Sequence, residues 1–395
     1  MIMLVTMAAL SELGLDRHGG MKLKRLDFLD ALRGLAAAYV VVYHMTLLPD
    51  PHLVAPEWAS KVAHAGGSGV MLFFVISAFS LYYTMPLRLK DSHSNWSFYL
   101  HRFFRIAPLF YAWIFFSLVR DAWYYSASHS PLSIVESATF IFNLVPQGQQ
   151  GFVWASWTIG IEMMFYAIFP LIYRYVDDIW RAIALVFVFI LGWMAYQTAI
   201  PYAYSPESAP QVETWTFVRF LPVFAIGGVI HFIVKEIHDR DQIRHATSIG
   251  LLLVAVSVYS YMALLNGQIN VYFADARVWQ GVIYGTLVVG LCLNPLKIFV
   301  NRFTAYLGRI SYSLYLGHTT VVLFITPIYR LIYGARVSTT IAYLSCYLLT
   351  LFLTIGLADL TYRFIEAPGV RCGKIVYQRL TKFWDRPLQN DSVAK

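Results

Sequence analysis

Ten apolar stretches, each long enough to cross a bilayer as a helix, dominate this 395-residue chain. A membrane-spanning helix needs roughly 17–25 predominantly apolar residues. Stretches of that length fall at 27–48, 66–87, 104–125, 155–173, 180–200, 216–234, 247–265, 278–294, 306–329 and 338–361. Only 13% of the residues are charged, against about 25% in soluble domains. We therefore predict an all-α polytopic membrane protein, a bundle of about ten transmembrane helices, and exclude a soluble fold.

The 30 Lys and Arg residues are divided unevenly between the two sides of the predicted membrane. Loops rich in Lys and Arg stay on the cytoplasmic side. With the N-terminus placed there, the outer segments hold only Lys61, Arg120, Arg277, Arg330 and Arg336. The pattern predicts two cytoplasmic termini and a multi-pass protein of the cytoplasmic (inner) membrane. Because the net charge of +8 is dispersed over short loops, it indicates topology and not nucleic-acid binding.

One membrane domain, which we place at 22–368, accounts for most of the sequence. It follows an N-terminal extension at 1–21, which we expect to be flexible, and precedes a basic cytoplasmic tail at 369–395. A second methionine, Met21, opens the basic run before the first span. Translation that starts at Met1 and translation that starts at Met21 are both compatible with the sequence. The three cysteines have no metal or redox spacing, so no metal is expected.

Two ionisable residues, Arg33 and His44, interrupt the first apolar stretch. Such groups are costly within a bilayer and usually face a functional interior. Their separation of 11 positions puts them on one face of a helix, about 16 Å apart along its axis. Asp30 lies one turn before Arg33 and can pair with it. The alternative is that each side chain only reaches toward its nearer membrane surface.

Two arginines, Arg102 and Arg105, lie one turn apart where the third span is entered. Guanidinium groups bind phosphoryl oxygens bidentately, so this pair suits the phosphates of a cytoplasmic ligand. The alternative is anchoring to anionic lipid of the inner leaflet. Ser77 in the second span adds a modest polar group, which is either a cavity residue or a packing residue.

A carboxylate, Glu162, lies in the outer third of the fourth span, at about the depth of His44. A carboxylate at this depth needs a partner. If Glu162 holds one nitrogen of His44, the other nitrogen is free to act as a general base. The alternative is a pair with Arg219 or with a backbone donor.

The ninth span is unusually polar for a membrane helix and can line a cavity. Its candidate acceptor-cavity residues are Ser311, Tyr312, Tyr315 and His318, of which Ser311 and His318 share a face. Hydrogen bonds between helices would explain the same pattern. Trp157, near the outer face, is either a platform for a sugar ring or part of an aromatic belt.

Six motifs occur in order along the chain: LDALRGLAAAYVVVYH, GVMLFFVISAF, HRFFRIAPLFY, WTIGIE, LGRISYSLYLGH and YRFIEAP. Together they resemble the membrane acyltransferase-3 family. These integral-membrane O-acyltransferases and O-acetyltransferases move acyl groups from cytoplasmic acyl-CoA onto sugars of surface polysaccharides. The resemblance covers about 24–368. It departs from the family pattern at His101, Ala78 and Gly317, where many members have Arg, Gly and Trp.

The resemblance implies roles for the residues that match its motifs. Arg33 and His44 correspond to the essential Arg–His motif, Arg102 and Arg105 to the basic motif, and Glu162 to the motif glutamate. The implied donor is acyl-CoA, with acetyl-CoA expected, bound by Asp30, Arg33 and the two motif arginines. The implied acceptor is a saccharide, either a surface polysaccharide or a lipid-linked precursor.

We expect acyl transfer inside the bundle, with His44 as general base or as a covalent acyl carrier. The printed sequence has no appended soluble domain, so we expect the ten-span unit to complete the transfer. Two other classes of protein fit the same residues. One is a secondary transporter in which Arg33, His44 and Glu162 relay protons. The other is a sensor or assembly partner without catalytic activity.

Overall fold

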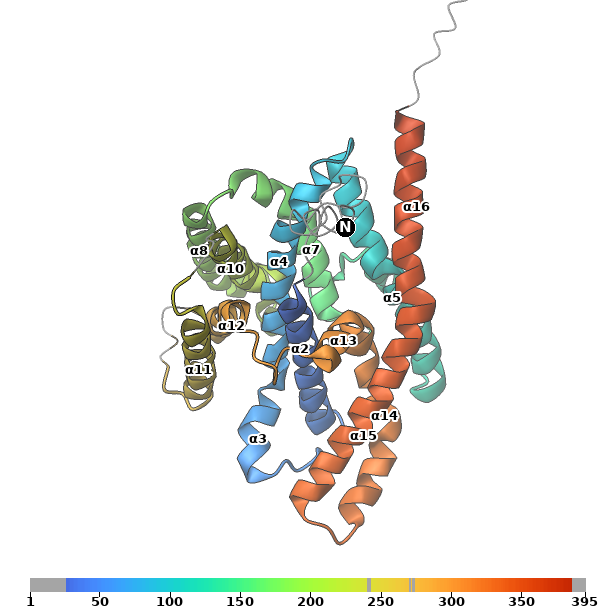
Figure 1. The fold of residues 1–395 in the computed structure, drawn as a ribbon. Coiled ribbons are helices and arrows are strands. Elements are labelled where there is room, and N and C mark those ends of the chain that lie inside the picture. Colours follow the sequence, from blue (N-terminus) through green and yellow to red (C-terminus); the bar gives the residue numbers. More distant parts are fainter. Residues whose placement is uncertain (1–25, 240–242, 270, 272–273, 386–395) are drawn as a thin grey trace, which may run out of the picture.

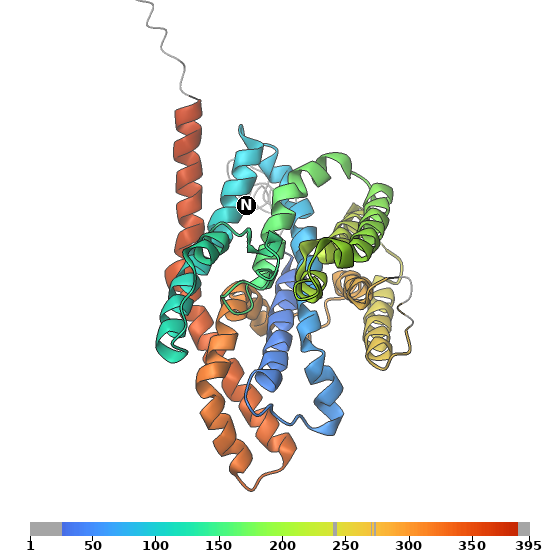
Figure 2. The same ribbon diagram turned by 180° about the vertical axis from the view of Figure 1, so that it is seen from behind.

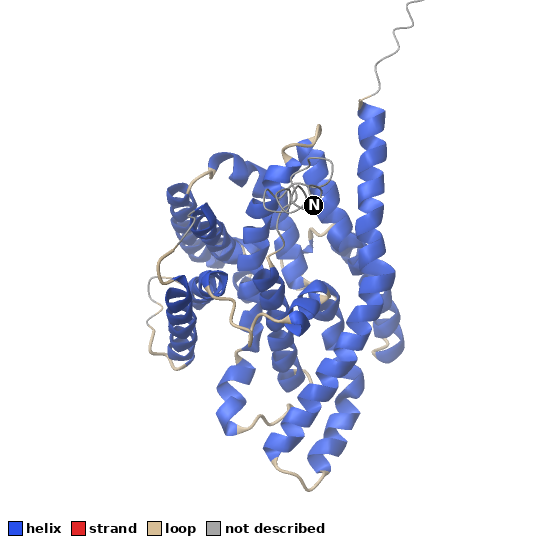
Figure 3. Ribbon diagram, in the orientation of Figure 1, coloured by secondary structure: helices blue, strands red, loops and turns tan. Residues whose placement is uncertain are grey.

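The computed structural model describes residues 26–239, 243–269, 271 and 274–385, and these residues form helices and loops with no strand (Figure 3). The predicted extension at 1–21 and the end of the predicted tail lie outside the described residues.

The longer helices coincide with the predicted spans (Figure 1). Their bounds are α2 Asp27–Leu47, α4 Gly69–Arg88, α5 Ser94–Tyr124, α7 Trp157–Tyr175, α8 Ile179–Ala203, α10 Leu221–Asp239, α11 Ala246–Leu265, α12 Ala276–Leu293, α14 Ser311–Gly334 and α15 Thr339–Thr361. Shorter helices connect them: α3 Glu57–His64, η1 Gly66–Ser68, α6 Pro131–Ala138, η2 Phe142–Leu144, α9 Ala209–Trp215, η3 Phe217–Phe220 and α13 Arg302–Arg309.

Nine helical segments in the described part of the chain are long and apolar enough to cross a membrane. The predicted fourth span, at 155–173, is present as the helix α7 but is not among the nine. Glu162 and Arg174 lie within α7 and lower its hydropathy. The class is confirmed as an all-helical, multi-pass membrane protein, whereas the cytoplasmic location of the termini stays a prediction.

The helix α2 lies in the middle of the bundle in both views (Figure 1 and Figure 2). It packs against α13, α4 and α14. The closest approach is at Gly308 of α13, where a Cβ would lie 1.8 Å from the carbonyl oxygen of Asp30. A glycine is therefore required here, and its packing fixes the turn of α2 that carries Asp30 and Arg33.

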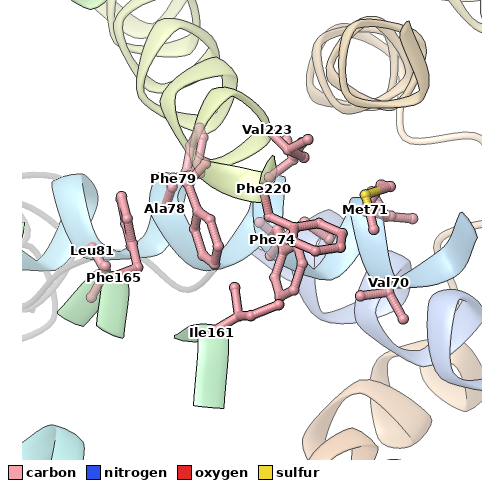
Figure 4. Packing of buried hydrophobic residues seen from close by; sticks show 14 of the residues in the cluster. Val70, Met71, Phe74, Ala78, Phe79, Leu81, Ile161, Phe165, Phe220 and Val223 are labelled. Carbon is pink, nitrogen blue, oxygen red and sulfur yellow. The ribbon is translucent and has the colours of Figure 1, made fainter. Parts of the chain in front are cut away.

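An aromatic core joins α4, α7 and α10 on one side of α2 (Figure 4). The ring centroids of Phe74 and Phe224 are 4.5 Å apart, and those of Phe165 and Phe224 are 4.1 Å apart. Stacked rings of this kind add to the burial of their apolar surface. The core fixes α4 and α7 relative to each other, and both helices supply polar residues to the site described below.

Two predicted boundaries differ from the structure. The predicted ninth span, at 306–329, is interrupted at Ile310, where α13 ends and α14 begins. The predicted tail, from residue 369, begins inside a further helix, α16 Ala367–Trp384, which projects beyond the bundle (Figure 1). A π-helical turn, η4 Tyr362–Glu366, joins α15 to α16. Such turns often occur at functional sites.

Candidate active site

A cavity of about 200 Å³ opens among α2, α4, α5, α7 and α14, and we call it the arginine cavity. Its lining includes three cations, Arg33, Arg102 and Arg105, and one carboxylate, Glu162. The remaining lining residues are Val70, Phe73, Phe74, Ser77, Ser80, Ile106, Thr158, Ile159, Tyr166, Ser311, Tyr312 and Tyr315. Three guanidinium groups converge on this cavity, and guanidinium groups bind the oxygens of an anionic ligand bidentately.

The guanidinium of Arg33 is held by two neighbours. Its Nη1 donates to Oδ1 of Asp30 at 3.2 Å, so the pair expected from the sequence is present. Its Nη2 donates to Oγ of Ser80 at 2.6 Å. Sequence reasoning missed Ser80, although its position one turn after Ser77 on α4 indicates a shared polar face.

Arg105 is anchored by Glu366, a residue to which sequence reasoning gave no role. The Arg105 Nη1 donates to Oε1 of Glu366, which is only 1% exposed. The second oxygen of this carboxylate accepts a hydrogen bond from Ser313 Oγ at 2.7 Å. The Arg105 guanidinium also lies 5.8 Å from the ring centroid of Tyr312. The acidic residue of the YRFIEAP motif was the available signal, and the π-helical turn places it.

Arg102 lines the same cavity beside Arg105. Its Nη2 donates to Oγ1 of Thr84 at 3.1 Å, and its guanidinium lies 5.5 Å from the ring centroid of Tyr166. Both motif arginines therefore face an interior cavity. This position favours binding of a ligand inside the bundle over the alternative of anchoring to lipid.

The expected pair between Glu162 and His44 is wrong. Glu162 accepts hydrogen bonds from Ser77 Oγ at 2.6 Å and from the hydroxyl of Tyr166. These donors lie on α4 and one turn along α7, so the carboxylate is satisfied locally within the arginine cavity. The alternative partner, Arg219, binds Asp275 instead, with 2.5 Å between Nη2 and Oδ2.

A second cavity, of about 600 Å³, contains His44, and we call it the histidine cavity. The predicted Trp157 lines it together with Trp154 and Trp215. Its other lining residues are Tyr43, Leu48, His64, Ala65, Gly67, Ser68, Val70, Met71, Gln150, Gly151, Val153, Ala155, Ala276, Arg277, Gln280, Tyr315 and Thr319. Three other predicted acceptor-cavity residues, Ser77, Ser311 and Tyr312, line the arginine cavity instead.

The partner of His44 is His318, from α14. Nε2 of His318 lies 2.9 Å from Nδ1 of His44, which is also 3.1 Å from the carbonyl oxygen of Val40. Nδ1 of His318 bonds to the carbonyl oxygen of Tyr315. His318 is completely buried, and the two imidazole centroids are 4.8 Å apart.

These partners define the tautomers of the two neutral imidazoles. A carbonyl oxygen can only accept, so Nδ1 of His318 carries a hydrogen and its Nε2 carries a lone pair. Nδ1 of His44 must then donate to that lone pair, which leaves Nε2 of His44 unprotonated. An imidazole held in this tautomer has the free nitrogen that a general base requires.

The two cavities meet at Tyr315 and Val70, which line both of them. The hydroxyl of Tyr315 accepts a hydrogen bond from Thr158 Oγ1 at 3.1 Å. Its ring contacts Phe73 edge to face, with 5.8 Å between centroids. The helix α2 therefore extends from the arginine cavity at Arg33 to a cavity with a paired imidazole at His44. Among the described residues, no group of three or more His, Cys, Asp or Glu residues could hold a metal ion.

This architecture defines a polytopic helical membrane protein with two polar cavities that meet inside the bundle. The chain belongs to the membrane acyltransferase-3 family, because the family model described as "Acyltransferase domain" matches residues 26–360. The resemblance found in the six motifs is thereby confirmed.

Individual relatives are distant in sequence. "Putative acetyltransferase ORF330" of Acidianus two-tailed virus is 26% identical over 296 residues, which are 73% of this chain and 80% of the viral protein. O-acetyltransferase OatA of Staphylococcus aureus (strain NCTC 8325 / PS 47) is 22% identical over 378 residues, which are 87% of this chain and 57% of OatA. The chain thus spans little more than half the length of OatA. No solved structure matches it significantly.

Proposed function

We propose that this protein transfers an acyl group, in the simplest case acetyl, from acyl-CoA to a hydroxyl group of a saccharide. The acyl-CoA enters the arginine cavity from the cytoplasm, and the saccharide occupies the histidine cavity on the opposite side. The saccharide belongs to a surface polysaccharide or to its lipid-linked precursor. The relatives named as acetyltransferases support the choice of an acetyl group. The predicted topology supports the assignment of the two cavities to opposite sides of the membrane.

The observation that carries this proposal is the meeting of the two cavities at Tyr315. A cavity lined by several guanidinium groups suits the phosphates of coenzyme A, which Arg102 and Arg105 would bind through their guanidinium forks. Arg33 would bind the donor deeper in the bundle. The acyl thioester would then reach the junction while the hydroxyl group approached it from His44.

The reaction needs one base and no net change of charge. Nε2 of His44 takes the proton of the saccharide hydroxyl, and the oxygen attacks the thioester carbonyl carbon. The C–S bond breaks, and the departing coenzyme A thiolate receives the proton from His44. His318 holds His44 in the required tautomer. A positioned base of this kind contributes about 10²–10⁴-fold to the rate.

A transfer assay with purified protein tests this proposal. We expect free coenzyme A and acetylated oligosaccharide to form when the protein meets radiolabelled acetyl-CoA and a surface-glycan oligosaccharide. The variant His44→Ala should lose about 100-fold or more of the rate while still binding acetyl-CoA. His52→Ala, which changes an exposed histidine outside both cavities, serves as the matched control.

The same assay separates the two other classes of protein. When the assay is run with the protein in sealed vesicles, a transporter would move the oligosaccharide across the membrane without consuming acetyl-CoA, and a sensor would neither consume acetyl-CoA nor move the oligosaccharide. Near-normal transfer by His44→Ala would remove His44 from the catalytic role.

A further inference from the structure

The histidine cavity has one charged side chain that the acyl transfer described above does not use. Arg277, near the start of α12, lines the cavity. No Asp or Glu is among the described residues that line it, and histidines are its other titratable basic groups. A molecule bound in this cavity therefore meets a guanidinium that no lining carboxylate faces.

The nearest carboxylate, Asp275, is shared between two arginines. Arg219 binds it closely, with Nη2 at 2.5 Å and Nε at 2.7 Å from Oδ2. Nη1 of Arg277 lies 3.3 Å from each oxygen of the same carboxylate. Two guanidinium groups and one carboxylate leave one net positive charge. Because Arg219 lies closer to the Asp275 carboxylate than Arg277 does, the remaining positive charge is available on Arg277 for a ligand in the cavity.

Asp275 is ionised in this arrangement. Burial alone would raise the pKa of its carboxyl, but the positive charges of Arg277 and Arg219 outweigh burial and hold the pKa below its ordinary value. Asp275 also accepts a hydrogen bond from the backbone nitrogen of Arg277 at 2.9 Å. The start of α12 is thereby fixed, and the Arg277 side chain lies on the side of α12 that faces the histidine cavity.

The other walls of the histidine cavity suit a saccharide chain. Trp154, Trp157 and Trp215 line it, and the rings of Trp157 and Trp215 pack at 4.8 Å. Gln280 lies one turn after Arg277 on α12 and also lines the cavity. Ligand sites of this type combine aromatic walls with a few polar groups that fix orientation.

We propose that Arg277 binds an anionic group of the acceptor, so that the histidine cavity selects an acidic saccharide. The anion is a sugar carboxylate or a phosphate, and both are acceptors that a guanidinium binds bidentately. This inference rests on the proposed function, because it names the class of saccharide that occupies the acceptor cavity. The alternative is that Arg277 only ties the start of α12 to Asp275.

Binding of matched oligosaccharides to the full chain in lipid nanodiscs tests this inference without requiring catalysis. The probes are an oligosaccharide that contains glucuronic acid, its neutral methyl ester, and a neutral oligosaccharide that carries one phosphate. Quenching of tryptophan fluorescence reports binding, because three tryptophans line the cavity. The variant Arg277→Gln is compared with Arg336→Gln, which changes an exposed arginine outside the cavity.

We expect the native protein and Arg336→Gln to bind the glucuronic acid probe at least about tenfold more tightly than its methyl ester. Arg277→Gln should bind both probes equally, with unchanged affinity for acetyl-CoA as evidence of correct folding. Tighter binding of the phosphate probe than of the glucuronic acid probe would assign the anion as phosphate.

Three results would overturn the inference: equal affinity of the native protein for the acidic and neutral probes, no binding of any probe, or a preference for the acidic probe that survives in Arg277→Gln. Adding acetyl-CoA to the same samples separates this failure from that of the proposed function. Discrimination between probes without acetyl transfer would contradict the acyltransferase proposal and leave the anion site intact. Transfer to the acidic and neutral probes at equal rates would contradict the anion site and leave the acyltransferase proposal intact.

Discussion

At the scale of single residues, the reactivity proposed for His44 depends on its neighbour. His318 contacts Nδ1 of His44 and is itself fixed by the carbonyl oxygen of Tyr315. In the familiar catalytic triads a carboxylate orients the histidine. Here a second, buried imidazole takes that position, and the carboxylate of Glu162 remains in the arginine cavity.

Replacement of His318 by alanine tests its role as a positioning residue. We expect kcat for acetyl transfer to fall roughly tenfold or more because His44 is no longer held in one tautomer. The KM for acetyl-CoA should stay within about twofold, because His318 does not line the arginine cavity. The dependence of kcat on pH should also change, which loss of packing alone would not produce. An unchanged pH profile and an unchanged kcat would contradict this role.

The predicted contact between Glu162 and His44 failed because it depends on how two helices are rotated relative to each other. The sequence gives the depth of a residue in the membrane and its face on its own helix. It does not give the rotation of one helix relative to another. Glu162 was expected to meet His44, whereas His318 was expected only to line a cavity, and the packing of α7 and α14 around α2 places His318 against His44 instead. Arg33 and Asp30 share one helix, so their pairing could be predicted.

At the scale of elements, the π-helical turn η4 anchors one arginine of the arginine cavity. It places Glu366 against Arg105 and Ser313, which come from α5 and α14. Three helices are therefore joined at one buried carboxylate. The sequence indicated a conspicuous YRFIEAP segment, but the irregular turn that aims Glu366 inward depends on contacts with α5 and α16.

Replacement of Glu366 by glutamine tests this connection. Arg105 would lose its ionic partner, so we expect the KM for acetyl-CoA to rise roughly tenfold with kcat at saturating donor changed less than about threefold. Steady-state kinetics measures both quantities, and Glu57→Gln at an exposed position serves as the control. A fall in kcat with an unchanged KM would show that Glu366 acts on the chemical step instead of on donor binding.

At the scale of the whole molecule, the class and the positions of the longer helices could be predicted because bilayer thickness fixes the length of an apolar run. The interruption at Ile310 was missed because Leu307 and Ile310 extend the apolar run of α14 toward its N-terminus. The polar cavities were missed as separate sites because their residues come from several helices far apart in the sequence. Tyr315 illustrates this point: it was predicted to line a cavity, and it lines two.

The most direct test of transfer through the bundle uses sealed vesicles in which all copies of the protein have one orientation. Labelled acetyl-CoA, which does not cross the bilayer, is supplied on the side of the arginine cavity, and an oligosaccharide is enclosed on the side of the histidine cavity. We predict that the enclosed oligosaccharide becomes acetylated, and that His44→Ala abolishes the signal. Equal acetylation when donor and oligosaccharide are both confined to the histidine side would contradict transfer between the two cavities.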